Sequence, residues 1–161
     1  MTKRFDFKRI VTLCYVVAFA VYLILGLQPA GAVQYEVSGA LEIPSINLYS
    51  DVTTLELKDH RLNTPDTIVG SYSRYSSKTL LIGHSTTVFK DLKQAKVGEI
   101  VTYNGKKYLI KDATIIAKPK INMDALLAPE TRNTIIIMTC AGEILEGQDA
   151  THRLVVTATE L

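Results

Sequence analysis

Cys140 is the residue of this chain best suited to covalent chemistry. It follows the apolar, β-branched run 135–138, which has the length and composition of a buried strand. Arg153 stands after a polar loop, at the start of the next apolar run. Thiolate is the nucleophilic form of cysteine, and a fixed positive charge nearby stabilises either the thiolate or the oxyanion that it generates. The spacing therefore predicts a nucleophile and a cation at facing ends of two neighbouring strands.

His84 is the histidine best suited to work with Cys140. It follows a glycine at the end of the apolar run 79–83, so a second strand also delivers a reactive side chain at its end. If both strands lie in one sheet, their ends can meet and give the Cys/His pairing of nucleophilic catalysis. The histidine precedes the cysteine, which excludes a papain-like order. His60 lies in a charged stretch typical of a solvated turn, and strand alternation puts His152 on the face opposite its neighbouring arginine.

These segments resemble the sortases, the membrane-tethered cysteine transpeptidases of mainly Gram-positive bacteria. The resemblance covers about residues 40–161. It rests on an apolar strand ending in Gly-His, a second ending in Thr-Cys, and an arginine before a Val-rich strand. Similar features are the Ile-Pro within residues 41–48, and the helix and Gly-acidic turn expected over residues 88–99. The family's common strand ending is Thr-Leu-x-Thr-Cys, and this chain has Ile136 and Ile137 in the first two positions.

The resemblance implies transpeptidation of a secreted protein's C-terminal sorting signal, of the Leu-Pro-x-Thr-Gly type. Cys140 would attack the carbonyl before the scissile bond, and His84 would protonate the leaving amine. Arg153 would steady the oxyanion or the substrate. An amine of a cell-wall precursor, or a lysine of another protein, would then resolve the acyl-enzyme. The expected substrate-binding residues lie in or before the Cys strand: Thr139, Ala117, Ile121 and Leu126.

Two other classes of function stay open from the sequence. In a hydrolase, water would take the same acyl-enzyme, as in a cysteine peptidase that trims proteins. In a membrane-tethered β-barrel binding module, Cys140 would be merely a small buried residue at a strand end. Product analysis with and without an added amine distinguishes a hydrolase from a transpeptidase. Labelling with a mild thiol electrophile distinguishes a binding module, whose buried thiol would stay unmodified, from an enzyme.

The fold class indicated is all-β: an eight-stranded, sortase-like barrel with a few short helices. Turn signals recur between short apolar runs, and no long pattern with a 3.6-residue period appears. Asn104-Gly105 is a strong hairpin signal. The strands expected are 41–48, 52–55, 68–72, 79–83, 100–103, 107–116, 135–139 and 153–159. The helices or helical turns expected are 57–62, 88–95 and 123–127.

The N-terminal segment predicts a membrane anchor. Residues 10–27 carry no charge, and a helix of 18 residues spans roughly 27 Å, close to the hydrocarbon thickness of a bilayer. Basic residues precede this stretch, so the positive-inside rule puts the first residue in the cytoplasm and the rest outside. A cleaved signal peptide is the competing interpretation, with a small-x-small site at 30–32. The domains expected are 1–32 as tail and anchor, 33–40 as linker and 41–161 as catalytic domain.

Charge and cysteine usage exclude several functions. Of the 18 basic and 16 acidic residues, 14 and 15 follow residue 32, so the outer part has a net charge of −1 and no electrostatic footprint for nucleic acid. A single cysteine in that part cannot form a disulfide framework. No metal or nucleotide motif is present, so no cofactor is expected. Carboxylates in the loop after the cysteine could bind calcium or an incoming amine, or simply be solvated: Glu143, Glu146 and Asp149.

Overall fold

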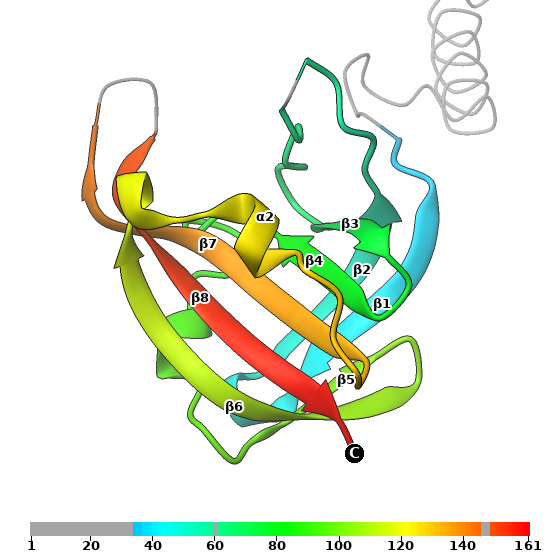
Figure 1. The fold of residues 1–161 in the computed structure, drawn as a ribbon. Coiled ribbons are helices and arrows are strands. Elements are labelled where there is room, and N and C mark those ends of the chain that lie inside the picture. Colours follow the sequence, from blue (N-terminus) through cyan, green and yellow to red (C-terminus); the bar gives the residue numbers. More distant parts are fainter. Residues whose placement is uncertain (1–33, 60, 146–148) are drawn as a thin grey trace, which may run out of the picture. The chain divides into compact units, whose positions relative to one another are not determined.

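The computed structural model describes residues 34–59, 61–145 and 149–161, and within them eight strands close into a β-barrel (Figure 1). The order around the barrel is β1-β2-β3-β4-β7-β8-β6-β5, and β5 pairs with β1 to complete it. The strands are β1 Val37–Ile43, β2 Leu48–Thr54, β3 Val69–Tyr75, β4 Lys78–Ile82, β5 Ile100–Tyr103, β6 Lys106–Ala117, β7 Thr134–Ile144 and β8 Ala150–Glu160. The all-β, eight-stranded prediction is confirmed.

Strand β7 is the centre of the arrangement that concerns function. It pairs in parallel with β4 on one side, ending at Ile82 opposite Met138, and antiparallel with β8 on the other. The strands that carry His84, Cys140 and Arg153 are therefore adjacent in one sheet, as the sequence predicts. Figure 1 shows β7 in orange between β4 in green and β8 in red.

Both faces of β4 and β7 are covered, which explains why their sequences read as continuous apolar runs rather than alternating ones. One face contributes Leu81, Ile135 and Ile137 to a core cluster that draws residues from every strand and fills the barrel. The other face contributes Leu80 and Ile136 to a second cluster outside it. Burying one such side chain stabilises the fold by about 1.5–3 kcal/mol.

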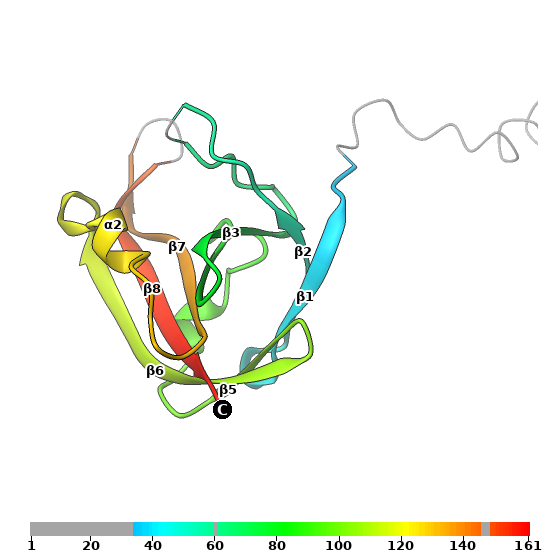
Figure 2. The same cartoon turned by 45° about the vertical axis from the view of Figure 1, so that its right-hand side comes forward.

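The outer cluster is covered by α2, Met123–Leu126 (Figure 2). The Asn122 side chain caps this helix by accepting a hydrogen bond from the Ala125 N–H at 3.1 Å, as asparagine does at many helix N-termini. A short helix at 123–127 is thus confirmed. The connection from β6 to α2 contains the 3-10 turn η3, Lys118–Lys120.

Two expected elements differ in kind, and not only in their bounds, from the structure. Residues 41–48 were expected as one strand, but Pro44–Ile46 form a 3-10 turn, η1, and Asn47 has a φ of 52°. That left-handed residue, which asparagine tolerates, reverses the chain into a β1–β2 hairpin. By contrast, the hairpin predicted at Asn104-Gly105 is confirmed, with φ values of 49° and 76° that suit a primed turn.

The second difference concerns residues 88–95, expected as a helix. The chain there makes successive turns, and only η2, Leu92–Gln94, is helical, of the 3-10 type. Phe89 and Leu92 are almost fully buried, and the Leu92 N–H donates to the Phe89 carbonyl at 3.1 Å. A spacing of three fits a 3-10 turn, in which positions i and i+3 eclipse. Both side chains therefore enter the barrel core together.

The expected membrane helix at residues 10–27 and the tail before it lie outside the described residues. Within the residues that the structure does describe, no helix has both the length and the apolar character needed to cross a membrane. Around residues 57–62, the expected turn is held by mutual backbone hydrogen bonds between Lys58 and Arg61.

We expect a truncated chain beginning at residue 34 to fold on its own. Every ladder of the barrel closes within Glu36–Leu161, which forms a compact unit, so the barrel needs no ladder partner from earlier residues. Circular dichroism and a thermal melt, with the full-length chain in detergent as the control, would measure this. A truncated chain that is insoluble or lacks strand signal contradicts the expectation.

Candidate active site

A cleft of about 460 Å³ lies over the outer face of β4 and β7. His84, Cys140 and Arg153 all line it, just beyond the last β4–β7 ladder pair. The rest of the lining is mostly apolar: Leu57, Leu62, Tyr72, Leu80, Ile82, Met123, Leu127 and Met138. An ion pair between Arg74 and Asp124, 2.6 Å long, borders the cleft where β3 turns toward the start of β4. The cleft therefore has reactive groups at one end and an apolar floor along the strands.

His84 is held at the end of β4 by the segments around it. Its carbonyl accepts hydrogen bonds from the backbone N–H groups of Thr87 and Phe89, at 3.3 and 3.0 Å. Its side chain is 36% exposed, and its Nε2 lies 3.7 Å from the Asp66 carboxylate. The preceding Gly83 leaves room for this packing, since a Cβ there would lie 2.5 Å from the Val88 side chain.

Thr139 ties the two strand ends together. Its hydroxyl donates to the Gly83 carbonyl at 2.7 Å, although the two residues are 56 positions apart in sequence. Because Thr139 directly precedes the cysteine and Gly83 directly precedes the histidine, this buried bond fixes the approach of both. This hydrogen bond lies one residue past the last β4–β7 ladder pair, so it continues the link between the two strands up to the site.

Cys140 lies within β7, directly opposite Arg153 in the antiparallel pairing with β8. The expectation that the strand ends at residue 139 was wrong, because β7 continues to Ile144. Gly142, with a φ of 77°, lies in a register shift between residues 141 and 144, so it makes a bulge rather than ending the strand. Cys140 is a free, partly exposed cysteine.

Arg153 has a fixed guanidinium, only 16% exposed. Its Nη1 donates to the carbonyls of Ala150 at 3.0 Å and His152 at 2.9 Å, and its Nη2 donates to Asp149 Oδ1 at 2.7 Å. These three bonds use three of the five N–H donors of an arginine. The remaining two, on Nε and Nη2, have no partner among the described residues. The cation is therefore oriented and still has donors for a substrate.

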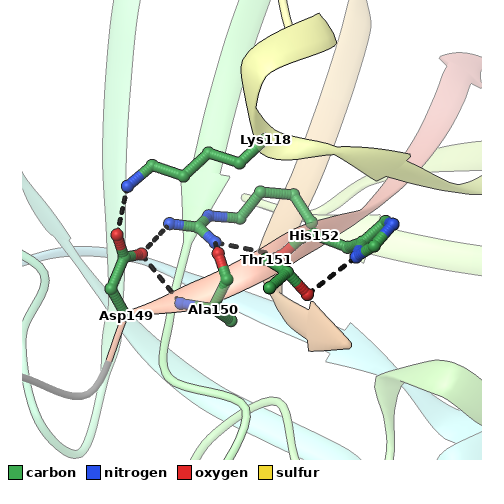
Figure 3. A network of polar contacts seen from close by, with 6 residues as sticks. Lys118, Asp149, Ala150, Thr151 and His152 are labelled. Atoms are coloured by element: carbon green, nitrogen blue, oxygen red, sulfur yellow. Dashed lines mark hydrogen bonds and ion pairs between the residues drawn. The ribbon is translucent and has the colours of Figure 1, made fainter. Parts of the chain in front are cut away.

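Asp149 forms an ion pair with a second cation besides Arg153. Lys118, in η3, bonds the other carboxylate oxygen, and the Ala150 N–H donates to Oδ1 at 2.9 Å (Figure 3). The hydrogen bond from Lys118, followed by that from Arg153, holds the pKa of Asp149 far below its usual range. This role of Asp149 was not predicted from the sequence. The signal available was an acid four residues before the arginine.

The structure separates the predicted substrate-binding residues. Thr139 lines the cleft, whereas Ala117, Ile121 and Leu126 are not among its lining residues. Ala117 ends β6 opposite His152, and Leu126 packs against the outer cluster. Substrate binding by these three residues stays a prediction. The neighbours of Leu126 in and after α2 line the cleft instead.

The remaining candidates contribute little to the cleft. His152 does not line it, and its Nδ1 lies 2.8 Å from the Thr151 hydroxyl. His60 and Glu146 lie outside the described residues. Among the residues described, no cluster of three or more His, Cys, Asp or Glu side chains could hold a metal ion. Calcium binding stays a hypothesis, and both carboxylate oxygens of Asp149 already bond cations.

Comparison with solved structures finds the same barrel in several proteins. A lid mutant of sortase A from Corynebacterium diphtheriae superposes with a TM-score of 0.61 at 21% identity, covering 87% of this chain and 78% of its own. Sortase C-1 from Actinomyces oris gives 0.59 at 24%, covering 89% and 79%. Sortase A from Listeria monocytogenes gives 0.61 at 15%, covering 78% and 87%. At these identities the likeness concerns the fold.

The sequence comparisons give one match and one negative result. A search of curated protein sequences found no match. The family model of the sortase domain matches residues 41–161, which is most of the chain and includes all three residues of the reactive end. The chain therefore belongs to the sortase family of cysteine transpeptidases.

Proposed function

We propose that this protein cleaves a C-terminal sorting signal of the Leu-Pro-x-Thr-Gly type and transfers the acyl group to an amine. The observation that carries the proposal is the meeting of His84, Cys140 and Arg153 at one end of an apolar cleft. Membership of the sortase family supports the reaction class. The particular signal and the mechanism are our inference.

In the proposed reaction, the Cys140 thiolate adds to the carbonyl carbon before the scissile bond. Arg153 donates to the resulting oxyanion, or to a neighbouring carbonyl of the substrate, through the donors that its anchors leave free. The C–N bond then breaks as His84 gives a proton to the leaving amine. A second amine attacks the thioester, gives a proton to the now deprotonated His84 and receives the acyl group, which regenerates the thiolate.

The dimensions of the cleft support an extended peptide as the substrate. Along the end of β4 and just beyond it, the cleft lining runs from Leu80 through Ile82 to His84, a stretch of five residues, or roughly 17 Å at 3.3 Å per residue. An extended peptide of about five residues has the same length. The apolar side chains along the floor suit leucine and proline, because burying their apolar surface away from water is favourable.

The partners and location belong to the same proposal. The acyl donor is a secreted protein, and the acceptor is an amine of a cell-wall precursor or of a protein lysine. Residues 10–27 anchor the chain in the lipid bilayer, with residues 41–161 on the extracytoplasmic side. Nucleic acid has no part in it.

Mass spectrometry of the protein after incubation with sorting-signal peptides tests the proposal. We expect a thioester adduct on Cys140, and a peptide–amine product whose share rises with added triglycine or lysine. A product that is only the free acid at every amine concentration identifies a hydrolase instead. No adduct, together with a Cys140 inert to a mild thiol electrophile, identifies a non-catalytic binding module.

A further inference from the structure

We propose that Asp149 is a positioning residue that holds the Arg153 guanidinium in its working orientation, and that Lys118 holds Asp149 in turn. The inference rests on the proposed function, because it assigns Arg153 to the reaction. It adds two residues that are not themselves among those lining the cleft.

The first argument is charge. Of the three groups that Arg153 bonds, two are backbone carbonyls and only Asp149 carries a full negative charge. A cation with 16% of its side chain exposed has lost most of its water, and such a group needs a charged or well-bonded partner. Asp149 supplies that charge from the same hairpin, four residues away.

The second argument is geometry. Each oxygen of the Asp149 carboxylate accepts from a different cation, Oδ1 from Arg153 and Oδ2 from Lys118 (Figure 3). Lys118 belongs to η3, which follows β6, whereas Arg153 belongs to β8. The carboxylate is therefore held from two elements and cannot rotate freely. Its Oδ1, which receives Arg153, keeps a defined direction.

The third argument is what the arrangement leaves free. The bonds that Arg153 donates to Asp149 and to the two carbonyls use both hydrogens of Nη1 and one of Nη2. The donors that remain belong to a guanidinium that lines the cleft. Without Asp149 the guanidinium could turn its donors away. A misplacement of about 1 Å can cost roughly 10²-fold in rate, so a modest rotation has a large effect.

Asp149→Asn tests the first link. We expect its acylation rate with a sorting-signal peptide to fall about 10- to 100-fold, mostly in kcat rather than KM, and Asp149→Glu to restore part of it. Lys118→Met should lose only a few-fold, because the Asp149–Arg153 bond persists. Asp51→Asn is the matched control, since it makes the same chemical change at an exposed carboxylate outside the cleft lining, and we expect its rate to stay native.

A double variant separates positioning from a merely structural role. If Asp149 acts through Arg153, then Asp149→Asn should lower the rate of Arg153→Ala no further. Multiplying effects would overturn the proposal, as would an Asp149→Asn protein that acylates within two-fold of native.

A measurement without turnover keeps the proposal testable if the proposed function fails. In ¹⁵N-arginine NMR spectra, a guanidinium held by three bonds should show separate, slowly rotating Nη signals. We expect these signals for Arg153 in the native and Asp51→Asn proteins, and their merging in Asp149→Asn. Unchanged signals in Asp149→Asn would refute the positioning role, whatever the native protein does with peptides.

Discussion

Replacing Cys140 by alanine abolishes acyl-enzyme formation, and adding His84→Ala to that variant changes nothing more. This is the largest effect that we expect. Without the thiol no thioester can form, so the histidine has no leaving group to protonate. Residues that act as one unit are non-additive in this way.

The single variant His84→Ala keeps its nucleophile but lacks the proton donor. Positioned general acids contribute about 10²- to 10⁴-fold, so acylation should slow by that factor. Acyl-enzyme yield over time, measured by mass spectrometry, gives the rate. Thermal melts should change little, because His84 is partly exposed and its contact with Asp66 is long, and exposed ion pairs contribute about 1 kcal/mol at most.

One result would remove His84 from the mechanism: a folded His84→Ala protein that acylates at the native rate. His152 would then be the histidine to test, although it does not line the cleft. A His84→Ala protein that is unfolded would contradict the placement of the side chain at the cleft rather than in the core.

Arg153→Lys should lose most activity although the charge is kept. The native guanidinium makes three hydrogen bonds to its own hairpin and still has two donors left. An ammonium has three donors in total and no planar fork, so it cannot keep these anchors and also bond the substrate. Losing one such donor to an oxyanion costs about 10²- to 10³-fold in kcat.

Steady-state kinetics with a peptide substrate measure this loss, and Arg132→Lys, an exposed arginine outside the cleft lining, is the control. Folding should barely change, because the lysine can still reach Asp149. Near-native turnover by the Arg153→Lys protein would mean that Arg153 acts only as a diffuse positive charge.

The meeting of the reactive groups could be predicted from the sequence because it depends on local patterns. The stretches 80–82 and 135–138 are apolar at every position, since both of their faces are covered. Two such strands favour one sheet, and residues just past their ends then converge. The Asn104-Gly105 hairpin was predictable for a similar reason, because two adjacent residues specify the turn.

The cleft and the network behind it could not be predicted in this way. The apolar walls come from single residues of separate segments, such as Leu57, Tyr72 and Met123, with no shared periodicity. Asp149 resembles any loop carboxylate until Lys118 is brought to it from η3. Likewise, the break after residue 43 depends on one left-handed asparagine, which a strand-like composition conceals.

The parallel pairing of β4 with β7 also bears on how the chain folds. Gly83 and Thr139 meet across 56 residues, and contacts of such long range form late, because the entropy of closing the intervening chain must be overcome first. Neither a hairpin nor any other local fragment brings His84 next to Cys140. Under the proposed mechanism, a nascent chain therefore carries an unassisted thiol, and the proposed pair of nucleophile and general acid forms only when β4 and β7 come together.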